Sequence, residues 1–414
     1  MQTQDKDKIL ACLLKRIRVD HDCSTIDISK RIHVTQQYIS EIEKGRKAMN
    51  LSLFNEAIEL FNIHFDADID YTQVDNLIDG CIAIFLYKPE LLSEHLKEII
   101  SSDKYKYSYY YKIHILLEYI YYSLFGESKD WNKELLTDQI RTLEKTYTNK
   151  EILFFYASYL IESVKFQNIV YEEFENILFK TNLIKIDEDN ELECGLYASI
   201  VFLTTSIYER KMKMLNLMDT LKESRKYFKK ALLFKGYLYS QAYLANCYSV
   251  LDKEMESNQI LSRTKTIASA LNEKEVIELI DYQCATKDIL KSDYKSAINK
   301  LLKFKYKKGF NRHKLLLCII YMSIEKRQEA KKILQTIDYE SLTNVSEKVY
   351  YKLKTMINEN LDFTKLIDSV GCNNVFLSMS DRIVVLNILI DYCKEHEIDC
   401  SEQEMLLRSI KFSL

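Results

Sequence analysis

The chain has 414 residues, with 7 glycines, one proline and a formal net charge of −3. So few helix breakers, without alternating Val/Thr-rich runs between turn signals, favour an all-α protein. No apolar run reaches the roughly 20 residues of a membrane-spanning helix. The polar N-terminus carries no secretion signal, so we expect a cytoplasmic protein. The ten cysteines form no CxxC pair, and we expect them to be small buried residues rather than disulfides.

The charge is distributed unevenly along the chain. Residues 1–50 hold ten Lys/Arg and seven Asp/Glu, which gives 10 − 7 = +3. The rest of the chain therefore carries −3 − 3 = −6. A basic head on a mildly acidic body fits contact of the head with phosphates and a different partner for the body.

The first predicted helix covers residues 6–19. Its apolar stripe has helical spacing and consists of Ile9, Leu10, Leu13, Leu14 and Ile17. Three basic residues lie off this stripe and are candidate phosphate contacts: Lys15, Arg16 and Arg18.

Residues 24–47 follow as two short helices joined by a tight turn. Thr35 is placed as the N-cap of the second helix, because its hydroxyl can accept a hydrogen bond from a free N–H of the first turn. Gly45 follows the last apolar position, where a left-handed residue readily ends a helix. This pattern predicts a helix-turn-helix with residues 36–43 as the recognition helix. His33 in the turn would need a left-handed conformation or a different turn.

Residues 34–45, Val-Thr-Gln-Gln-Tyr-Ile-Ser-Glu-Ile-Glu-Lys-Gly, resemble the repressor/Cro-type helix-turn-helix. That family often has Gly where this chain has His33 and Ala where it has Ser29. The recognition helix would present Gln36 and Gln37 to base edges, since glutamine can bond adenine twice. Further candidate DNA contacts are Thr25, Thr35, Tyr38, Ser40, Lys44, Arg46 and Lys47, with Arg16 on the first helix. The resemblance assigns Glu43 a structural role inside the domain, and Thr25 either supports Gln36 or bonds a phosphate.

One more helix, over residues 51–65, completes this domain near Asp70. Beyond it the pattern is helix after helix with short polar connections, as expected for antiparallel neighbours. The helices are expected at residues 74–86, 89–100, 105–124, 132–147, 150–164, 170–179, 191–208, 215–234, 237–251, 254–270, 273–290, 294–304, 313–324, 327–335, 346–357, 381–393 and 401–412.

A degenerate repeat runs through residues 226–335. Ala297 and Ala330 each stand early in a second helix and are 33 residues apart, close to the 34-residue tetratricopeptide period. Ala231 resembles a small position of the same helix, and Ala242 and Ala245 resemble positions of the first helix. We therefore predict a tetratricopeptide-like right-handed helical solenoid, with a non-repeating helical domain as the alternative.

A solenoid of this kind has a concave groove that suits an extended peptide. Such a peptide needs polar side chains to satisfy its backbone. The candidates on inner helices are Tyr243, Asn246, Tyr282, Gln283, Lys287, Arg312 and Tyr321, with His313 as a further possibility. Packing between repeats is the alternative role for each. The tyrosine-rich segment 105–111 also suggests base stacking, but its continuation at helical spacing favours packing.

Signals for catalysis and metal binding are poor. Cys393, His396 and Cys400 have zinc-ligand chemistry but lack a fourth ligand. The sequence has no glycine-rich phosphate loop and no HExxH pair. We expect no enzyme activity, no metal and no cofactor.

A repressor-type helix-turn-helix joined to a long tetratricopeptide-like body resembles the peptide-pheromone receptors of low-GC Gram-positive bacteria, the Rap, Rgg, NprR, PlcR and PrgX group. The stretch 223–232, Glu-Ser-Arg-Lys-Tyr-Phe-Lys-Lys-Ala-Leu, is most similar to the arbitrium receptors (AimR) of temperate phages. The resemblance implies a transcriptional regulator in a bacterial host cell. Its binding to a double-stranded DNA operator would be controlled by a short linear signalling peptide in the groove.

The resemblance also implies a homodimer and three regions. These are a DNA-binding domain at 1–70, a peptide-sensing solenoid at 71–380 and C-terminal capping and dimerisation helices at 381–414. The dimer contact would use an apolar strip of Leu386, Ile390, Leu406 and Leu407. Two alternatives stay open: the body binds a protein such as a response regulator, or the protein is a dimeric repressor that needs no peptide.

Overall fold

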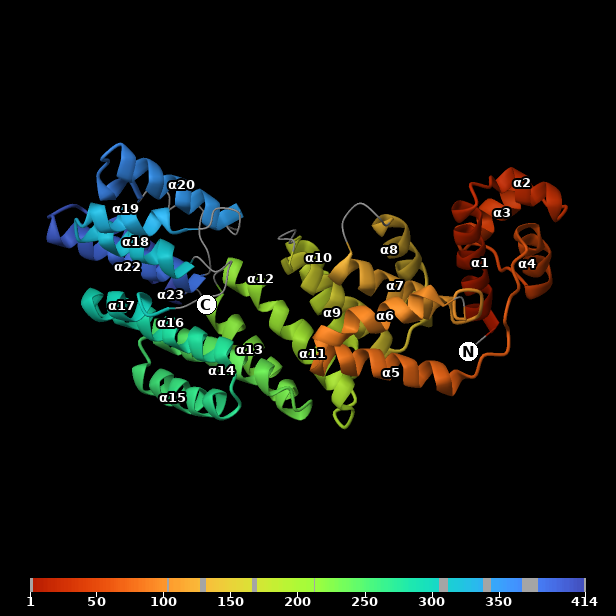
Figure 1. Ribbon diagram of the computed structural model, residues 1–414, viewed down its shortest axis with the longest axis horizontal. Helices are drawn as coiled ribbons and strands as arrows, with labels where there is room; N and C mark the ends of the chain where they lie inside the picture. The colour runs from red at the N-terminus through yellow and green to blue at the C-terminus, as the bar shows by residue number, and fades with distance from the viewer. Residues whose placement is uncertain are drawn as a thin grey trace. The chain divides into compact units, whose positions relative to one another are not determined.

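The computed structural model describes residues 3–102, 104–126, 132–165, 170–211, 213–304, 312–337, 344–366 and 379–412. Apart from an isolated bridge between Asp66 and Ser108, the described residues form helices, turns and irregular connections (Figure 1). The predicted all-α class is therefore confirmed. No helix in the described part is long and apolar enough to cross a membrane.

The helices group into two compact units. Unit 1 comprises residues 1–166 and 180–200, and unit 2 comprises residues 167–179 and 201–414. This division differs from the boundaries expected at residues 70 and 380, which stay predictions. The first 70 residues share a unit with the helices that follow them.

Unit 1 begins with the helix-turn-helix head. Its elements are α1 (Thr3–Asp20), α2 (Thr25–Arg31), α3 (Gln36–Glu43), α4 (Leu51–Ile58) and the short 3-10 helix η1 (Glu59–Phe61). The stripe predicted for α1 is buried, and Ile28, Ile39, Ile42 and Phe54 of α2, α3 and α4 also have no exposed surface. Burial of these side chains, each contributing about 1.5–3 kcal/mol, holds the short α2 and α3 in place.

The remaining helices of unit 1 carry a polar buried network as well as an apolar core. They are α5 (Tyr71–Tyr87), η2 (Pro89–Leu91), α6 (Leu92–Ser101), α7 (Tyr111–Phe125), α8 (Lys133–Thr142), η3 (Glu144–Thr146) and α9 (Asn149–Lys165), with the adjoining parts of α10 (Tyr171–Leu183) and α11 (Glu191–Leu203). In this network Lys112 pairs with Glu151 at 2.7 Å, and Tyr119 donates to Glu162 at 3.0 Å. Their burial makes these helices a rigid support.

The tyrosine-rich segment departs from the predicted helix in its first part. Residues 104–110 form turns, and α7 begins only at Tyr111. The buried Ser108 hydroxyl donates to the Tyr105 carbonyl and accepts from the Tyr110 N–H, so it competes with helical backbone bonds. Tyr105 and Tyr111 are buried, which agrees with packing rather than base stacking.

Unit 2 is a succession of antiparallel helix pairs. Its helices are α12 (Thr205–Arg210), α13 (Met214–Lys230), α14 (Phe234–Val250), α15 (Glu254–Ala270), α16 (Lys274–Leu290), α17 (Tyr294–Leu301), α18 (Arg312–Ser323), α19 (Arg327–Gln335), α20 (Asn344–Asn358), η5 (Phe363–Leu366), α22 (Met379–Glu395) and α23 (Ser401–Phe412). Neighbours in sequence pack together, notably α13 with α14, α14 with α15, α16 with α17 and α18 with α19 (Figure 1).

The repeat is longer than predicted in the first part of unit 2. Left-handed residues end α13, α14, α15 and α16 at Leu232, Asp252, Asn272 and Ser292, with φ between 54° and 60°. These positions are 20 residues apart (252 − 232), so a helix pair spans about 40 residues rather than 34. Ala297 and Ala330 are fully buried early in α17 and α19, as expected for the small positions of second helices.

Helix α22 lies against the inner helices of the solenoid. It packs on α14, α16 and α18 (Figure 1). The Tyr282 hydroxyl of α16 donates to Asp381 at 2.9 Å, and Ser292 and Tyr294 both donate to Asp391. The C-terminal helices are therefore part of the core of unit 2.

This packing corrects the predicted dimer strip. Leu386 is 1% exposed and Ile390 is 6% exposed, because both face helices of the same chain. Leu406 and Leu407 are half-buried against the same core. The strip predicted as a dimer contact is thus largely internal packing.

Candidate DNA-binding surface and ligand pocket

The turn between α2 and α3 is built around His33. This residue has a φ of +50°, so of the two possibilities left open by the sequence it takes the left-handed conformation. The following N–H, of Val34, donates to the Ser29 carbonyl at 3.0 Å and closes α2. The turn therefore has the backbone that a glycine would adopt there, with a histidine side chain exposed to solvent.

Both ends of the recognition helix α3 are capped as predicted. Thr35 is its N-cap, and its hydroxyl oxygen accepts from the Tyr38 N–H at 3.1 Å. At the other end Gly45 has a φ of +69°, and its N–H donates to the Ile42 carbonyl at 2.8 Å. The Arg46 N–H donates to the Glu41 carbonyl at 2.9 Å, which completes a Schellman motif.

Gln36 and Gln37 are exposed at the N-terminal end of α3. The Gln36 amide nitrogen donates to the Thr25 hydroxyl oxygen at 3.2 Å, so Thr25 supports Gln36. Tyr38 and Ser40 are half-buried, and the Lys47 ammonium lies 5.0 Å from the centroid of the Tyr38 ring. Tyr38 thus positions a cation beside the recognition helix.

Exposed cations surround this helix. Five basic side chains are exposed on α2 and around the end of α3: Lys30, Arg31, Lys44, Arg46 and Lys47. Arg46 pairs with Glu41 at 3.3 Å but is 66% exposed, so solvent weakens that pair. Sequence reasoning missed Lys30 and Arg31. Helical spacing is the signal that could have found them. Ile28 and Ser29 lie on the buried face of α2, so Lys30 and Arg31 lie on its outer side.

Three basic residues of α1 are engaged inside unit 1. Arg18 forms a two-bond pair with Glu43 at 2.7 and 2.8 Å, which agrees with the structural role expected for Glu43. Arg16 bonds Asp20 at 2.8 Å and Glu118 at 3.1 Å. Lys15 pairs with Asp138 at 3.1 Å. The structure therefore argues against the phosphate role predicted for Arg16, and equally for Lys15 and Arg18.

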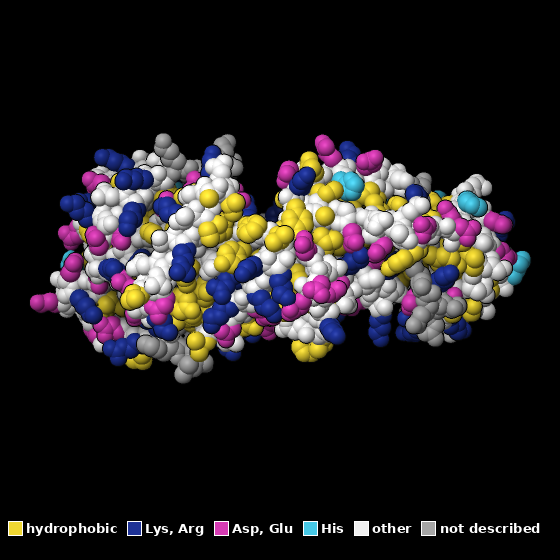
Figure 2. All heavy atoms as spheres, turned by 90° about the horizontal axis from the view of Figure 1, so that it is seen from below, with side chains coloured by type: hydrophobic (Ala, Val, Ile, Leu, Met, Phe, Trp, Pro, Cys, Tyr) yellow, Lys and Arg dark blue, Asp and Glu magenta, His cyan; other side chains and the backbone are white. Residues whose placement is uncertain are grey.

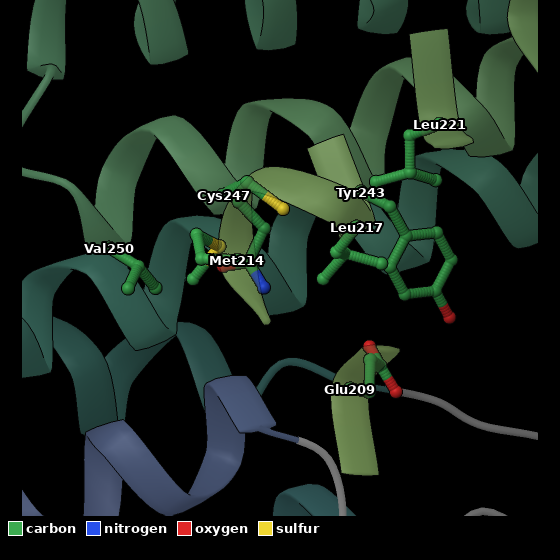
Figure 3. A pocket seen from close by; sticks show the side chains of 8 residues that line it. Glu209, Met214, Leu217, Leu221, Tyr243, Cys247 and Val250 are labelled. Atoms are coloured by element: carbon green, nitrogen blue, oxygen red, sulfur yellow. The ribbon is translucent and has the colours of Figure 1, made fainter. Parts of the chain in front are cut away.

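A small pocket opens among α12, α13 and α14 (Figure 3). The free space inside it is about 10 Å³, which is room for about one water molecule. Its lining is Glu209, Met214, Leu217, Leu221, Tyr243, Asn246, Cys247 and Val250. Burial raises the pKa of the Cys247 thiol, which keeps it neutral. The pocket therefore has a largely apolar lining with polar groups from Glu209, Tyr243 and Asn246, and little free space.

The predicted peptide contacts do not converge on one site. Tyr243 and Asn246 line the pocket. Tyr282 is 6% exposed and covered by α22, and Gln283 is 4% exposed.

The other predicted contacts are held elsewhere in unit 2. Lys287 is 9% exposed and bonds Asn258. Tyr321 is half-buried against the core, and the side chain of Arg312 lies outside the described part. On α16, Tyr282 is covered by α22, a long-range contact that the sequence did not indicate.

Among the described residues, no group of three His, Cys, Asp or Glu side chains could hold a metal ion. His396 instead stacks on Tyr392 with ring centroids 4.0 Å apart, and the buried Cys393 and Cys400 belong to the core of unit 2.

Comparisons with known proteins give little further information. No protein-family model matches the sequence, and no curated protein matches it. Among solved structures, the crystal structure of Bacillus thuringiensis PlcR in complex with the peptide PapR7 and DNA is similar at 15% sequence identity. The match covers 79% of this chain and 99% of that chain, with a TM-score of 0.31. A match of this strength indicates nothing about what the present chain binds.

Proposed function

We propose that this protein is a DNA-binding transcriptional regulator. The observation that carries the proposal is the exposed recognition helix, with Gln36 supported by Thr25 and five exposed cations around it. Exposed amides at the start of such a helix suit base edges in the major groove, and the cations suit phosphates. Two heads of a homodimer would bind two half-sites of an operator.

We further propose that a short linear peptide controls this binding, and that the protein acts as an arbitrium-type (lysis–lysogeny) receptor in a bacterial host cell. The resemblance of residues 223–232 to the arbitrium receptors supports the peptide proposal, and two of the predicted peptide contacts, Tyr243 and Asn246, lie together in the lining of the unit 2 pocket. A peptide can shift the regulator only through different affinities for its two states. In the arbitrium scheme the peptide-free form binds the operator and the peptide releases it.

Substitution of the two glutamines tests the DNA proposal. Gln36→Ala and Gln37→Ala should each weaken binding to a selected operator by about tenfold, because a base contact contributes roughly 1–3 kcal/mol. Binding to random DNA should change less than twofold, as expected for a residue that reads bases. The measurement is a titration of both DNAs at one salt concentration. Equal losses on the two DNAs would contradict base recognition by these residues.

Peptide control is tested with synthetic peptides encoded by small reading frames flanking the gene. A binding peptide should change operator affinity, and Asn246→Ala should weaken peptide binding by tenfold or more without altering DNA affinity of the free protein. Asn216→Ala is the matched control, because Asn216 is exposed on α13 and does not line the pocket. If no such peptide binds, the protein is better described as a dimeric repressor that needs none.

A second candidate function has support from the surface of α13. Residues 211–235 contain eight Lys/Arg and two Asp/Glu, and Lys222, Lys226 and Lys229 are exposed at helical spacing. Figure 2 shows a face on which Lys and Arg side chains gather in one dense group. A basic surface suits an acidic protein such as a response regulator. Replacing the three lysines with glutamine should abolish capture of such a partner and leave peptide binding unchanged.

A further inference from the structure

The head is joined to the rest of unit 1 by buried polar contacts. The Gln139 amide of α8 donates to the Cys12 carbonyl of α1 at 3.2 Å and accepts from the Tyr111 hydroxyl at 3.1 Å. Gln139 and Tyr111 are each 1% exposed. A single side chain thus connects α1, α7 and α8 in the interior, where loss of one partner leaves the others unsatisfied.

Ion pairs border this buried contact. Glu118 of α7 accepts from both terminal nitrogens of Arg16, at 3.1 and 3.4 Å, and Glu118 is 9% exposed. Asp138, the neighbour of Gln139 on α8, pairs with Lys15 of α1. The side chains of Glu118 and Arg16 are held in a low-dielectric environment, which strengthens their attraction.

The segment that leaves the head is fixed to the same support. The Asp66 N–H donates to the Tyr107 carbonyl at 2.9 Å. The Phe65 ring meets Phe54 of the head and Tyr109 edge-on, with centroids 5.2 and 5.0 Å apart. The connection after the head is therefore fixed to the head through Phe54 and to the tyrosine-rich segment through Tyr107 and Tyr109, unlike a flexible linker.

We propose that Gln139 and Glu118 are positioning residues that set the half-site spacing this regulator accepts. They act through α1: because α1 carries the core of the head, their contacts make the head and α5–α9 move as one body. The orientation of the recognition helix is then fixed by unit 1 as a whole, and the head does not rotate independently about residue 70. This inference rests on the proposed function, since spacing has meaning only for a two-headed DNA-binding protein.

The first test measures coupling in the full chain without DNA. Genetically encoded spin labels at the exposed positions Lys30 and Glu134 report the distance from α2 to α8. The wild-type protein should give one narrow distance distribution, and the Glu118→Gln/Gln139→Leu double variant a distribution at least twice as broad. Glu162→Gln is the matched control: Glu162 is 6% exposed and bonds Tyr119 and Lys133, but not α1. A broad wild-type distribution would overturn the proposal.

The second test measures spacing with two selected half-sites. Adding five base pairs, about half a helical turn, places one half-site on the opposite face of the DNA. The wild-type protein should lose at least tenfold in affinity, and the double variant less than threefold. An unchanged loss in the double variant would refute the positioning role. If the affinity of the wild-type protein does not depend on spacing, the proposal of two-headed DNA binding is wrong. The distance measurement then tests by itself whether the head and α5–α9 move as one body.

Glu118→Gln alone covers the case in which the double variant does not fold. It keeps the shape of the side chain and an oxygen that can accept from Arg16, but it removes the charge. We expect a distance distribution and a spacing loss between those of the wild type and the double variant. Wild-type values for both measurements would count against the proposal.

Discussion

At the scale of single residues, His33 shows how backbone geometry outweighs residue preference. Its φ of +50° is uncommon for a residue with a Cβ atom, and the resembling family often has glycine there. The fold keeps this conformation because the helices on both sides are fixed by buried isoleucines, among them Ile32 at 3% exposure. Strain of about 1 kcal/mol is small beside that burial.

Relief of this strain is measurable. His33→Gly should raise the free energy of unfolding by up to about 1 kcal/mol, because glycine adopts a positive φ without a steric penalty. Lys30→Gly, within α2, should lower it by a similar amount. The urea midpoint, followed by circular dichroism, distinguishes the two. A lower midpoint for His33→Gly would show that the histidine side chain itself stabilises the turn.

His114 is a second residue with a testable consequence. Burial, with smaller contributions from Lys106 and Arg16, lowers its pKa from 6.5 to about 3. The unfolded chain therefore binds a proton below pH 6.5 that the folded chain does not, and stability falls as the pH drops toward 3. The loss is about 1.4 kcal/mol per pH unit in that window.

Replacing His114 should remove that dependence. Between pH 7 and pH 5 the wild-type protein should lose about 2 kcal/mol more stability than His114→Leu. Urea denaturation at both pH values measures the difference, and His64→Leu, at an exposed position, serves as the control. Parallel losses in the wild-type and His114→Leu proteins would mean that another group governs the acid sensitivity.

At the scale of elements, α1 supports the recognition helix, because its basic side chains Arg16 and Arg18 pair with acidic residues of the same unit. The pair of Arg18 with Glu43 fixes α1 to α3, and their side chains are 18% and 8% exposed. Basic residues on a helix of this kind were expected to meet phosphates. Asp20 lies four residues after Arg16 and was visible in the sequence, but the other acidic partners are distant along the chain. These lie 25 residues away for Arg18 and 102 for Arg16.

Salt dependence separates the supporting from the DNA-binding cations. Lys44→Met should reduce the slope of log affinity against log salt by about 0.9, the effect of one lost phosphate contact. Arg18→Met should leave that slope unchanged while lowering the thermal stability, because it leaves Glu43 buried without its partner. A smaller slope for Arg18→Met would restore its phosphate role.

At the scale of the whole molecule, each compact unit has a distinct task in the proposed regulator. Unit 1 holds the recognition helix on a rigid support, and unit 2 holds the pocket. The core of unit 2 is completed by a segment that is distant in sequence. Ile383, Val384, Leu386, Ile388 and Leu389 of α22 are all 2% exposed or less.

Truncation tests whether α22 is core or a removable occupant of the inner surface. Burial of its apolar side chains contributes on the order of 10 kcal/mol, comparable to the stability of a whole domain. A chain ending at residue 378 should therefore lose the cooperative unfolding of unit 2 and bind a hydrophobic dye. If it kept the wild-type melting temperature, α22 would instead be a displaceable segment, and the inner surface a ligand groove.

The sequence by itself determined the local structure. Helical periodicity, the Thr35 cap and the left-handed Gly45 depend on neighbours within a few residues, and the structure agrees with all three. The sequence also indicated a turn at His33, but it left open whether the residue would be left-handed. Local preference also placed the small residues Ala297 and Ala330 in the interior.

Only the tertiary structure decided which side chains are free to bind. Arg16 is engaged by Glu118, and Tyr282 is covered by α22 through Asp381, 99 residues further along the chain. Tyr243 and Asn246 meet Glu209 in a pocket, while the other described candidates do not. Such long-range pairings depend on how whole helices pack. The spacing of residues along one helix does not indicate which other helix it packs against.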